Sequence, residues 1–153
     1  MPICNTNEFL NNLEKKKIMC IDIGKNKCGI ALSDPFNKFS LPHKVLRVSE
    51  RKIYEELINI IENYGINLIV VGLPLNDDNS LNKQCQSIID RTKYLDKKFV
   101  ELNKVLQIIF WDESYSTLEA LSKISNKKKD LDHHAACIIL QDFLDFSNKK
   151  NND

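Results

Sequence analysis

Three groups of acidic residues stand at positions where chemistry could gather. Asp22 interrupts the apolar run "IMCIDIG", Asp112 and Glu113 follow the run "VLQIIFW", and Asp132 precedes the run "AACIIL". A carboxylate inside a strand is costly to desolvate unless a cation compensates its charge. Carboxylate oxygens suit hard divalent ions such as Mg²⁺, and a pair of such ions is a common device for phosphodiester hydrolysis. If the fold brings the acids together, they predict a metal-dependent hydrolytic site.

Taken singly, each acid also has an ordinary structural role open to it. Asp22 could be a strand-end residue bonded to its own turn, and Asp112 and Glu113 could be solvated acids that lead into a helix. Asp132 could be an N-cap or first-turn residue that offsets the helix dipole. The metal interpretation therefore depends on the elements that carry these residues.

Alternating periodicities predict an α/β domain. The chain begins with a hairpin and a third extended segment, and it continues with buried strands joined by crossover helices. Pro42 interrupts the third extended segment and predicts that it lies at a sheet edge. The expected strands are residues 18–23, 28–33, 39–48, 67–72 and 105–111, and the expected helices are residues 49–61, 80–102, a short one from 116, and 132–146.

In open α/β sheets, ligands bind at the carboxyl ends of the parallel strands. Asp22, the pair Asp112 and Glu113, and Asp132 lie at such ends or on the adjoining helix, so we expect them to converge. Ala135 and Ala136 follow Asp132 by one turn. Small residues there would let the last helix press against the sheet, although alanine is also simply a good helix former.

Composition sets broad limits on the protein class. The 153 residues suffice for one domain, and the net charge of +1 indicates no particular partner. Five cysteines without CxxC spacing predict neither a disulfide framework nor a zinc site. No apolar run reaches the roughly 20 residues of a membrane span, and the first residues lack the apolar core of a secretory signal. We expect a cytoplasmic protein with an extension at residues 1–16, a domain at 17–147 and a frayed polar tail at 148–153.

Four motifs together resemble the YqgF/RuvX family of pre-16S rRNA nucleases, also described as Holliday-junction resolvases. The motifs are "DIGKNKCGIALSD", "IVVGLPLNDDNS", "FWDESYSTLEA" and "LDHHAACIILQDFL", and they extend over residues 18–146. The resemblance implies an RNase H-like fold. Its sheet is five-stranded and mixed, in the order 3-2-1-4-5, with helices on both faces.

The resemblance also implies roles for individual residues. Asp22, Glu113 and Asp132 match the catalytic acids, which would hold two Mg²⁺ or Mn²⁺ ions. Asp22 would bridge both ions, Asp132 would hold the ion that activates water, and Glu113 would hold the other. The expected substrate-binding residues are Gly24, Lys27 and Asn76 in the motifs, and Lys127, Lys128 and Lys129 in a predicted loop before Asp132.

Two departures from the family pattern predict a lower affinity for the phosphate groups of the substrate. Lys27 and Ser114 stand where the family usually has arginine, and a lysine lacks the planar fork of a guanidinium. Arg47, Arg51 and Arg91 fall on none of the motifs.

Three functions stay open at this stage. The first is an endonuclease that processes the 5′ end of precursor 16S rRNA, with ribosomal particles as possible partners. The second is a resolvase of structured DNA, which would need a two-fold dimer, and the third is a non-catalytic nucleic-acid-binding factor. The sequence does not decide between a monomer and a weak dimer, and it indicates no membrane partner.

Overall fold

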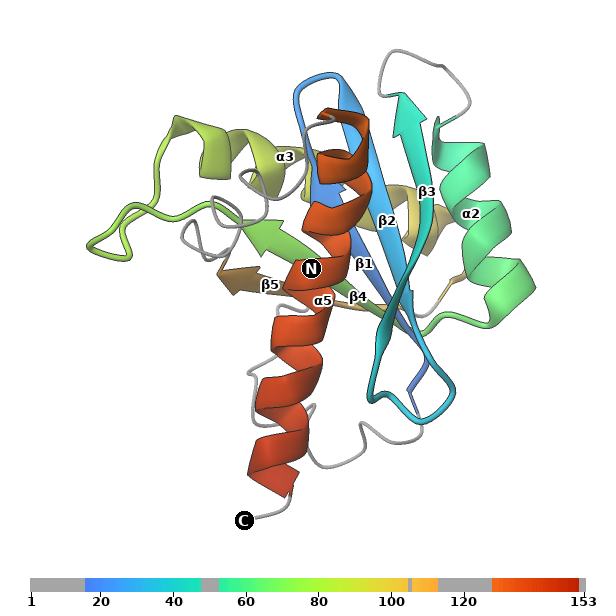
Figure 1. Ribbon diagram of the computed structural model, residues 1–153. Helices are drawn as coiled ribbons and strands as arrows, with labels where there is room; N and C mark the ends of the chain where they lie inside the picture. The colour runs from blue at the N-terminus through green and yellow to red at the C-terminus, as the bar shows by residue number, and fades with distance from the viewer. Residues whose placement is uncertain (1–15, 48–52, 105, 113–127, 152–153) are drawn as a thin grey trace.

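The computed structural model describes residues 16–47, 53–104, 106–112 and 128–151, without the side chains of 128–134 and 150–151. These parts form an α/β domain (Figure 1). The strands are β1 (Ile18–Ile23), β2 (Lys27–Ser33), β3 (Ser40–Arg47), β4 (Leu68–Leu73) and β5 (Gln107–Asp112), and the helices are α2 (Ile53–Tyr64), α3 (Lys83–Glu101) and α5 (Lys128–Asn151).

The five strands form one mixed sheet in the order β3-β2-β1-β4-β5. β1 pairs antiparallel with β2 and parallel with β4, while β2–β3 is antiparallel and β4–β5 is parallel. The sheet order is the one predicted, and β3 lies at the edge that Pro42 indicated. β1, which carries Asp22, is the central strand.

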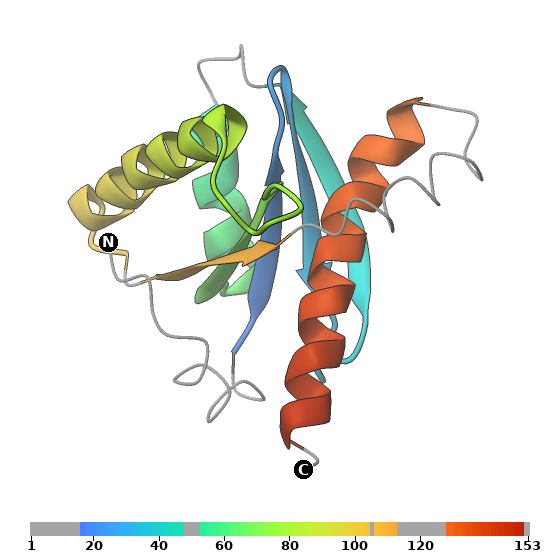
Figure 2. The same cartoon turned by 90° about the vertical axis from the view of Figure 1, so that its left-hand side faces the viewer.

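Helices cover both faces of the sheet, as predicted. Figure 2 shows α5 along one face and α2 and α3 against the other. Alternate residues of β1 point to these two layers: Met19, Ile21 and Ile23 pack in the core beneath α2 and α3, whereas Ile18 and Cys20 pack in the core beneath α5. β4 is buried along its whole length, as expected of a parallel strand covered on both faces.

The last helix is longer than the sequence predicted. α5 begins at Lys128 rather than Asp132 and continues to Asn151 rather than Phe146. Lys128 and Lys129 therefore lie in its first turn and not in a loop. Its last turns do not form a frayed tail, because Ser147 is buried and Asn148 Nδ2 donates a 3.1 Å hydrogen bond to the carbonyl of Asn37.

Other predicted features fall outside the described residues, namely nearly all of the N-terminal extension, the first residues of the expected helix 49–61 and the short helix from 116. α3 begins three residues later than predicted, after Asn82, whose side chain accepts a 2.9 Å hydrogen bond from the backbone N–H of Cys85. Within the described part of the chain, no helix is long and apolar enough to cross a membrane.

Candidate active site

Asp22 is half-buried near the carboxyl end of β1. Strand alternation puts its side chain on the face of Cys20, two residues earlier. Cys20 packs in one buried cluster with Ala136, Ile139 and Leu140 of α5. The carboxylate therefore faces the layer occupied by α5, just beyond the end of that apolar cluster.

Glycines lie beside Asp22 on both neighbouring strands. Gly29 of β2 is its direct cross-strand partner. On the other side, the pairing of Ile21 with Val71 brings Gly72 of β4 level with Asp22. Two of the four glycines of the chain thus flank the carboxylate, and a strand glycine commonly marks a point where a ligand approaches the backbone closely. At these two positions the neighbouring strands present no side chain beside the carboxylate.

α5 brings the position of Asp132 to the same face. Ala136 is fully buried against the sheet, and residues four apart on a helix share one face. The backbone of Asp132 lies one helical turn before Ala136 on this helix. The first turn of this helix also lies at the same end of the sheet as the β1–β2 turn (Figures 1 and 2).

Polar contacts fix α5 against the β2–β3 hairpin. Ser40 Oγ donates a 2.6 Å hydrogen bond to the carbonyl of Cys137, and the backbone N–H of Ser40 donates to Gln141 Oε1 at 2.9 Å. Gln141 Nε2 donates in turn to the carbonyl of Lys38 at 2.9 Å. These contacts hold the register of the helix along the sheet, and with it the position of Asp132.

On β5, Trp111 continues the row of level residues formed by Gly29, Asp22 and Gly72 across the sheet. Trp111 is level with Gly72 in the parallel register, and its indole N–H donates a 3.0 Å hydrogen bond to Asp142 of α5. Asp112, which follows, is exposed. Partial burial and the nearby charge of Asp142 raise the pKa of the Asp112 carboxyl.

The structure leaves part of the predicted metal set undescribed. Glu113 and Lys127 lie outside the described residues, as do the side chains of Asp132, Lys128 and Lys129. Among the described residues, no group of three or more His, Cys, Asp or Glu side chains is arranged to hold a metal ion. The grouping of Asp22, Glu113 and Asp132 stays a prediction.

The β1–β2 turn beside Asp22 requires glycine. The N–H of Gly24 donates a 2.8 Å hydrogen bond to the carbonyl of Lys27, and a Cβ at Gly24 would lie only 2.8 Å from that oxygen. Lys27 is half-buried at the start of β2. The tight turn therefore exposes backbone, without a side chain, next to the predicted metal site.

Sequence reasoning gave no role to Arg91, which the structure brings to this turn. Arg91 Nη1, on α3, donates a 2.9 Å hydrogen bond to the carbonyl of Gly24. The thiol of Cys28, the cross-strand partner of Ile23, interacts electrostatically with Asp22 and Arg91. Burial, and to a lesser extent the Asp22 carboxylate, raise the pKa of the Cys28 thiol to about 12, while the Arg91 guanidinium opposes the rise. A signal was available, since Arg91 follows the inward-facing Ile88 by three residues.

Asn76 lies in the exposed loop after β4. Its side-chain N–H donates to Ser80 Oγ at 2.9 Å, and its side-chain oxygen accepts a 3.0 Å hydrogen bond from Asn82. Asn82 also donates to the carbonyl of Pro74 at 2.8 Å. These contacts give Asn76 a loop-forming role beside its predicted role in substrate binding.

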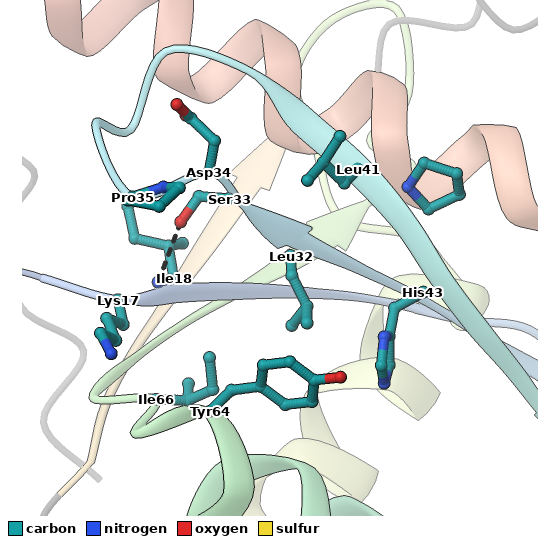
Figure 3. A pocket seen from close by; sticks show the side chains of 11 residues that line it. Lys17, Ile18, Leu32, Ser33, Asp34, Pro35, Leu41, His43, Tyr64 and Ile66 are labelled. Atoms are coloured by element: carbon teal, nitrogen blue, oxygen red, sulfur yellow. Dashed lines mark hydrogen bonds between the residues drawn. The ribbon is translucent and has the colours of Figure 1, made fainter.

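A hollow of about 430 Å³ lies at the other end of the sheet from Asp22 (Figure 3). It is mainly apolar, and it is lined by residues that include Ile18, Leu32, Leu41 and Tyr64. The acidic residue that lines the hollow, Asp34, accepts hydrogen bonds from the backbone N–H groups of its own turn. Because Ile18 and Asp22 stand near opposite ends of β1, this hollow is separate from the predicted site.

Comparison with known proteins identifies the family. A sequence model of the family described as "RuvX: Holliday junction resolvase" matches residues 16–146. The chain belongs to the RuvX family. RuvX proteins are nucleases, and so hydrolases, and the resemblance drawn from the four motifs is confirmed.

Relatives match over nearly their full length. A protein of Ehrlichia ruminantium (strain Welgevonden), named "Putative pre-16S rRNA nuclease", is 36% identical over 150 residues, which cover 92% of this chain and 93% of the relative. A protein of Clostridioides difficile (strain 630) with the same name is 38% identical over 141 residues, which cover 85% of this chain and 94% of the relative.

Solved structures support the fold. Thermus thermophilus RuvC in complex with a Holliday junction substrate superposes with a TM-score of 0.53 at 9% sequence identity, covering 89% of this chain and 97% of RuvC. At this identity the likeness concerns the fold alone. It confirms the RNase H-like architecture predicted from the sequence.

Proposed function

We propose that this RuvX-family protein is a metal-dependent endonuclease that acts on precursor 16S rRNA. One observation carries the proposal. Asp22, a half-buried carboxylate between two glycines, faces α5 near the carboxyl end of the central strand. A cation stabilises a carboxylate in such a place, and a strand glycine commonly marks a point where a ligand approaches the backbone closely.

Asp22, Glu113 and Asp132 would hold the metal ions. The donor set fits Mg²⁺ or Mn²⁺, because all three are carboxylates and glycines flank Asp22 on both neighbouring strands. When bound, two such ions activate the attacking water and stabilise the leaving oxygen. Asp22, on the central strand, would contribute to holding both ions, while Asp132 and Glu113 would each help to hold one.

The residues around the acids would bind the substrate. Gly24 offers backbone at a tight turn, and Lys27 adds a positive charge next to it. Lys128 and Lys129 open α5 and Lys127 precedes them in the sequence, so all three lysines lie within five residues of Asp132 along the chain. Phosphate contacts of this kind supply affinity without reading sequence.

The choice of RNA rests on the relatives, whose names refer to pre-16S rRNA. An enzyme with this substrate would work in the cytoplasm on precursor ribosomal particles. The second candidate is a junction-resolving DNA nuclease. The family description and the fold likeness to RuvC with its Holliday junction support this alternative.

One experiment separates these functions. The purified protein is incubated with Mg²⁺ or Mn²⁺ and a labelled RNA that spans the 5′ end of 16S rRNA and its precursor sequence. A parallel reaction contains a labelled four-way DNA junction. The proposal expects metal-dependent cleavage of the RNA. Cleavage of the junction alone would favour the resolvase, and binding without cleavage of either would favour a non-catalytic factor.

A further inference from the structure

A hollow of about 570 Å³ opens between α3 and the β1–β2 turn, and the function proposed above gives it no role. It lies on the α3 side of the sheet, opposite the face of Asp22, but at the same end of β1. The residues that line it are Ile23, Gly24, Lys25, Gln84, Ser87, Ile88 and Arg91.

The lining is suited to an anion. None of the seven described lining residues is acidic, and two of them, Lys25 and Arg91, are cationic. Gln84, Ser87 and Arg91 follow one another at intervals of three and four residues, so they form one polar row along α3. Gln84 and Ser87 are exposed and add neutral hydrogen-bond donors.

Arg91 is held in position to use its remaining donors. Its bond to the carbonyl of Gly24 occupies one N–H group, and a guanidinium has five. Among the described residues, no other hydrogen bond of this side chain is seen. Anchoring one arm of a guanidinium reduces the entropy lost when the other arm binds, and its planar fork matches two oxygens of a phosphate.

A purely structural role would explain less of this site. A contact that only joins α3 to the turn would need no more than the Arg91–Gly24 hydrogen bond. It gives no reason for Lys25, Gln84 and Ser87 to surround the same hollow without an acid among them. The two cations, Lys25 and Arg91, repel each other, and an anion bound between them would compensate that repulsion.

We propose that this hollow binds a backbone phosphate of the substrate strand, at a position flanking the bond that is cut. The strand would cross the end of the sheet over Gly24, which itself carries no side chain. Arg91 and Lys25 would contact the phosphate oxygens, with Gln84 and Ser87 at the rim. This inference rests on the proposed function, since it assigns a second contact to the same substrate.

The test measures binding of a labelled single-stranded RNA over a series of salt concentrations, with EDTA present to prevent cleavage. Each phosphate contact on single-stranded nucleic acid contributes about 0.7 to the slope of log affinity against log salt. Arg91→Gln should weaken binding by about tenfold or more, and it should flatten the slope by about 0.7. Because this variant also loses the bond to Gly24, a second position is needed.

Gln84 supplies that position, since it lines the hollow without bonding to the turn. Gln84→Lys should tighten binding and steepen the slope, and Gln84→Glu should do the opposite. The matched control is Gln86, which is exposed on another side of α3 and bonds to Asp90. The same two substitutions at Gln86 should change the affinity and the slope much less.

The possible results separate the two proposals. If the wild type binds RNA but Arg91→Gln and the Gln84 pair leave the slope unchanged, the hollow is not a phosphate site, while the proposed nuclease stands. If the Gln86 pair shifts binding as much as the Gln84 pair, the effect is general surface charge, and the inference is overturned as well. If the wild type neither binds nor cleaves nucleic acid, the proposed function itself fails.

Discussion

Replacing Ala136 by leucine should push α5 away from the sheet. Ala136 is fully buried, and the β1–β2 pair in its cluster, Cys20 and Ala31, is also small and fully buried. Extra carbon atoms in such a core cost about 1–3 kcal/mol of unfolding free energy. For a chain of this size, each kcal/mol lowers the melting temperature by about 2–4 °C, so the expected fall is about 2–12 °C.

The activity should fall by more than the stability explains. α5 carries Asp132, and a displacement of about 1 Å at a catalytic group can cost about 10²-fold in rate. The assay compares metal-dependent cleavage well below the melting temperature with thermal unfolding of the same samples. Ala135→Leu is the control, because Ala135 is only half-buried and alanine and leucine have similar helix propensities.

The reasoning would be refuted if Ala136→Leu melted and cleaved like the wild type. In that case the alanine would serve only as a helix former, and close approach of α5 would not be what positions Asp132. Equal losses in Ala135→Leu and Ala136→Leu would contradict it too, since only Ala136 is fully buried.

Three further predictions follow from the site. Mn²⁺ should raise the melting temperature of the wild type but not of Asp22→Asn, because a ligand that binds only the folded state stabilises it; equal shifts in both proteins would argue against a shared site. Alanine at all three lysines of residues 127–129 should flatten the salt dependence of RNA binding, since each contact releases counterions; an unchanged slope would make them ordinary surface. Cys28, which is buried and whose pKa is raised to about 12, should resist alkylation at pH 8 in the native protein and react after unfolding, as followed by mass spectrometry; rapid native labelling would contradict the burial.

The sheet could be read from local sequence because its strands carry their own signals. The apolar run of β1, the β-branched run of β4 and the proline of β3 gave their types and the edge position. These features depend on burial and on a missing N–H, which are properties of single strands. The sheet order itself came from the family resemblance.

The ends of α5 and the role of Arg91 could not be read in this way. The first turn of α5 is rich in lysine and has no apolar periodicity to mark it. Its last turns are polar, and Asn148 is anchored through a contact with Asn37, 111 residues away. Arg91 meets Gly24 across 67 residues. Hydrogen bonds between distant segments leave no pattern in the local sequence.

Cleavage by single-acid variants tests the central claim most directly. Asp22→Asn, Glu113→Gln and Asp132→Asn each remove one proposed metal ligand while keeping the side-chain shape. A loss of several kcal/mol in transition-state stabilisation corresponds to about 10²-fold or more in rate. Asp112→Asn is the matched control, because Asp112 is exposed and adjacent residues of a strand point to opposite faces.

We expect Asp22→Asn, Glu113→Gln and Asp132→Asn to fold, as judged by circular dichroism, and to lose metal-dependent cleavage of precursor RNA. Asp112→Asn should keep most of its activity. The account is contradicted if Asp22→Asn cleaves like the wild type, or if Asp112→Asn is inactive while Glu113→Gln is not.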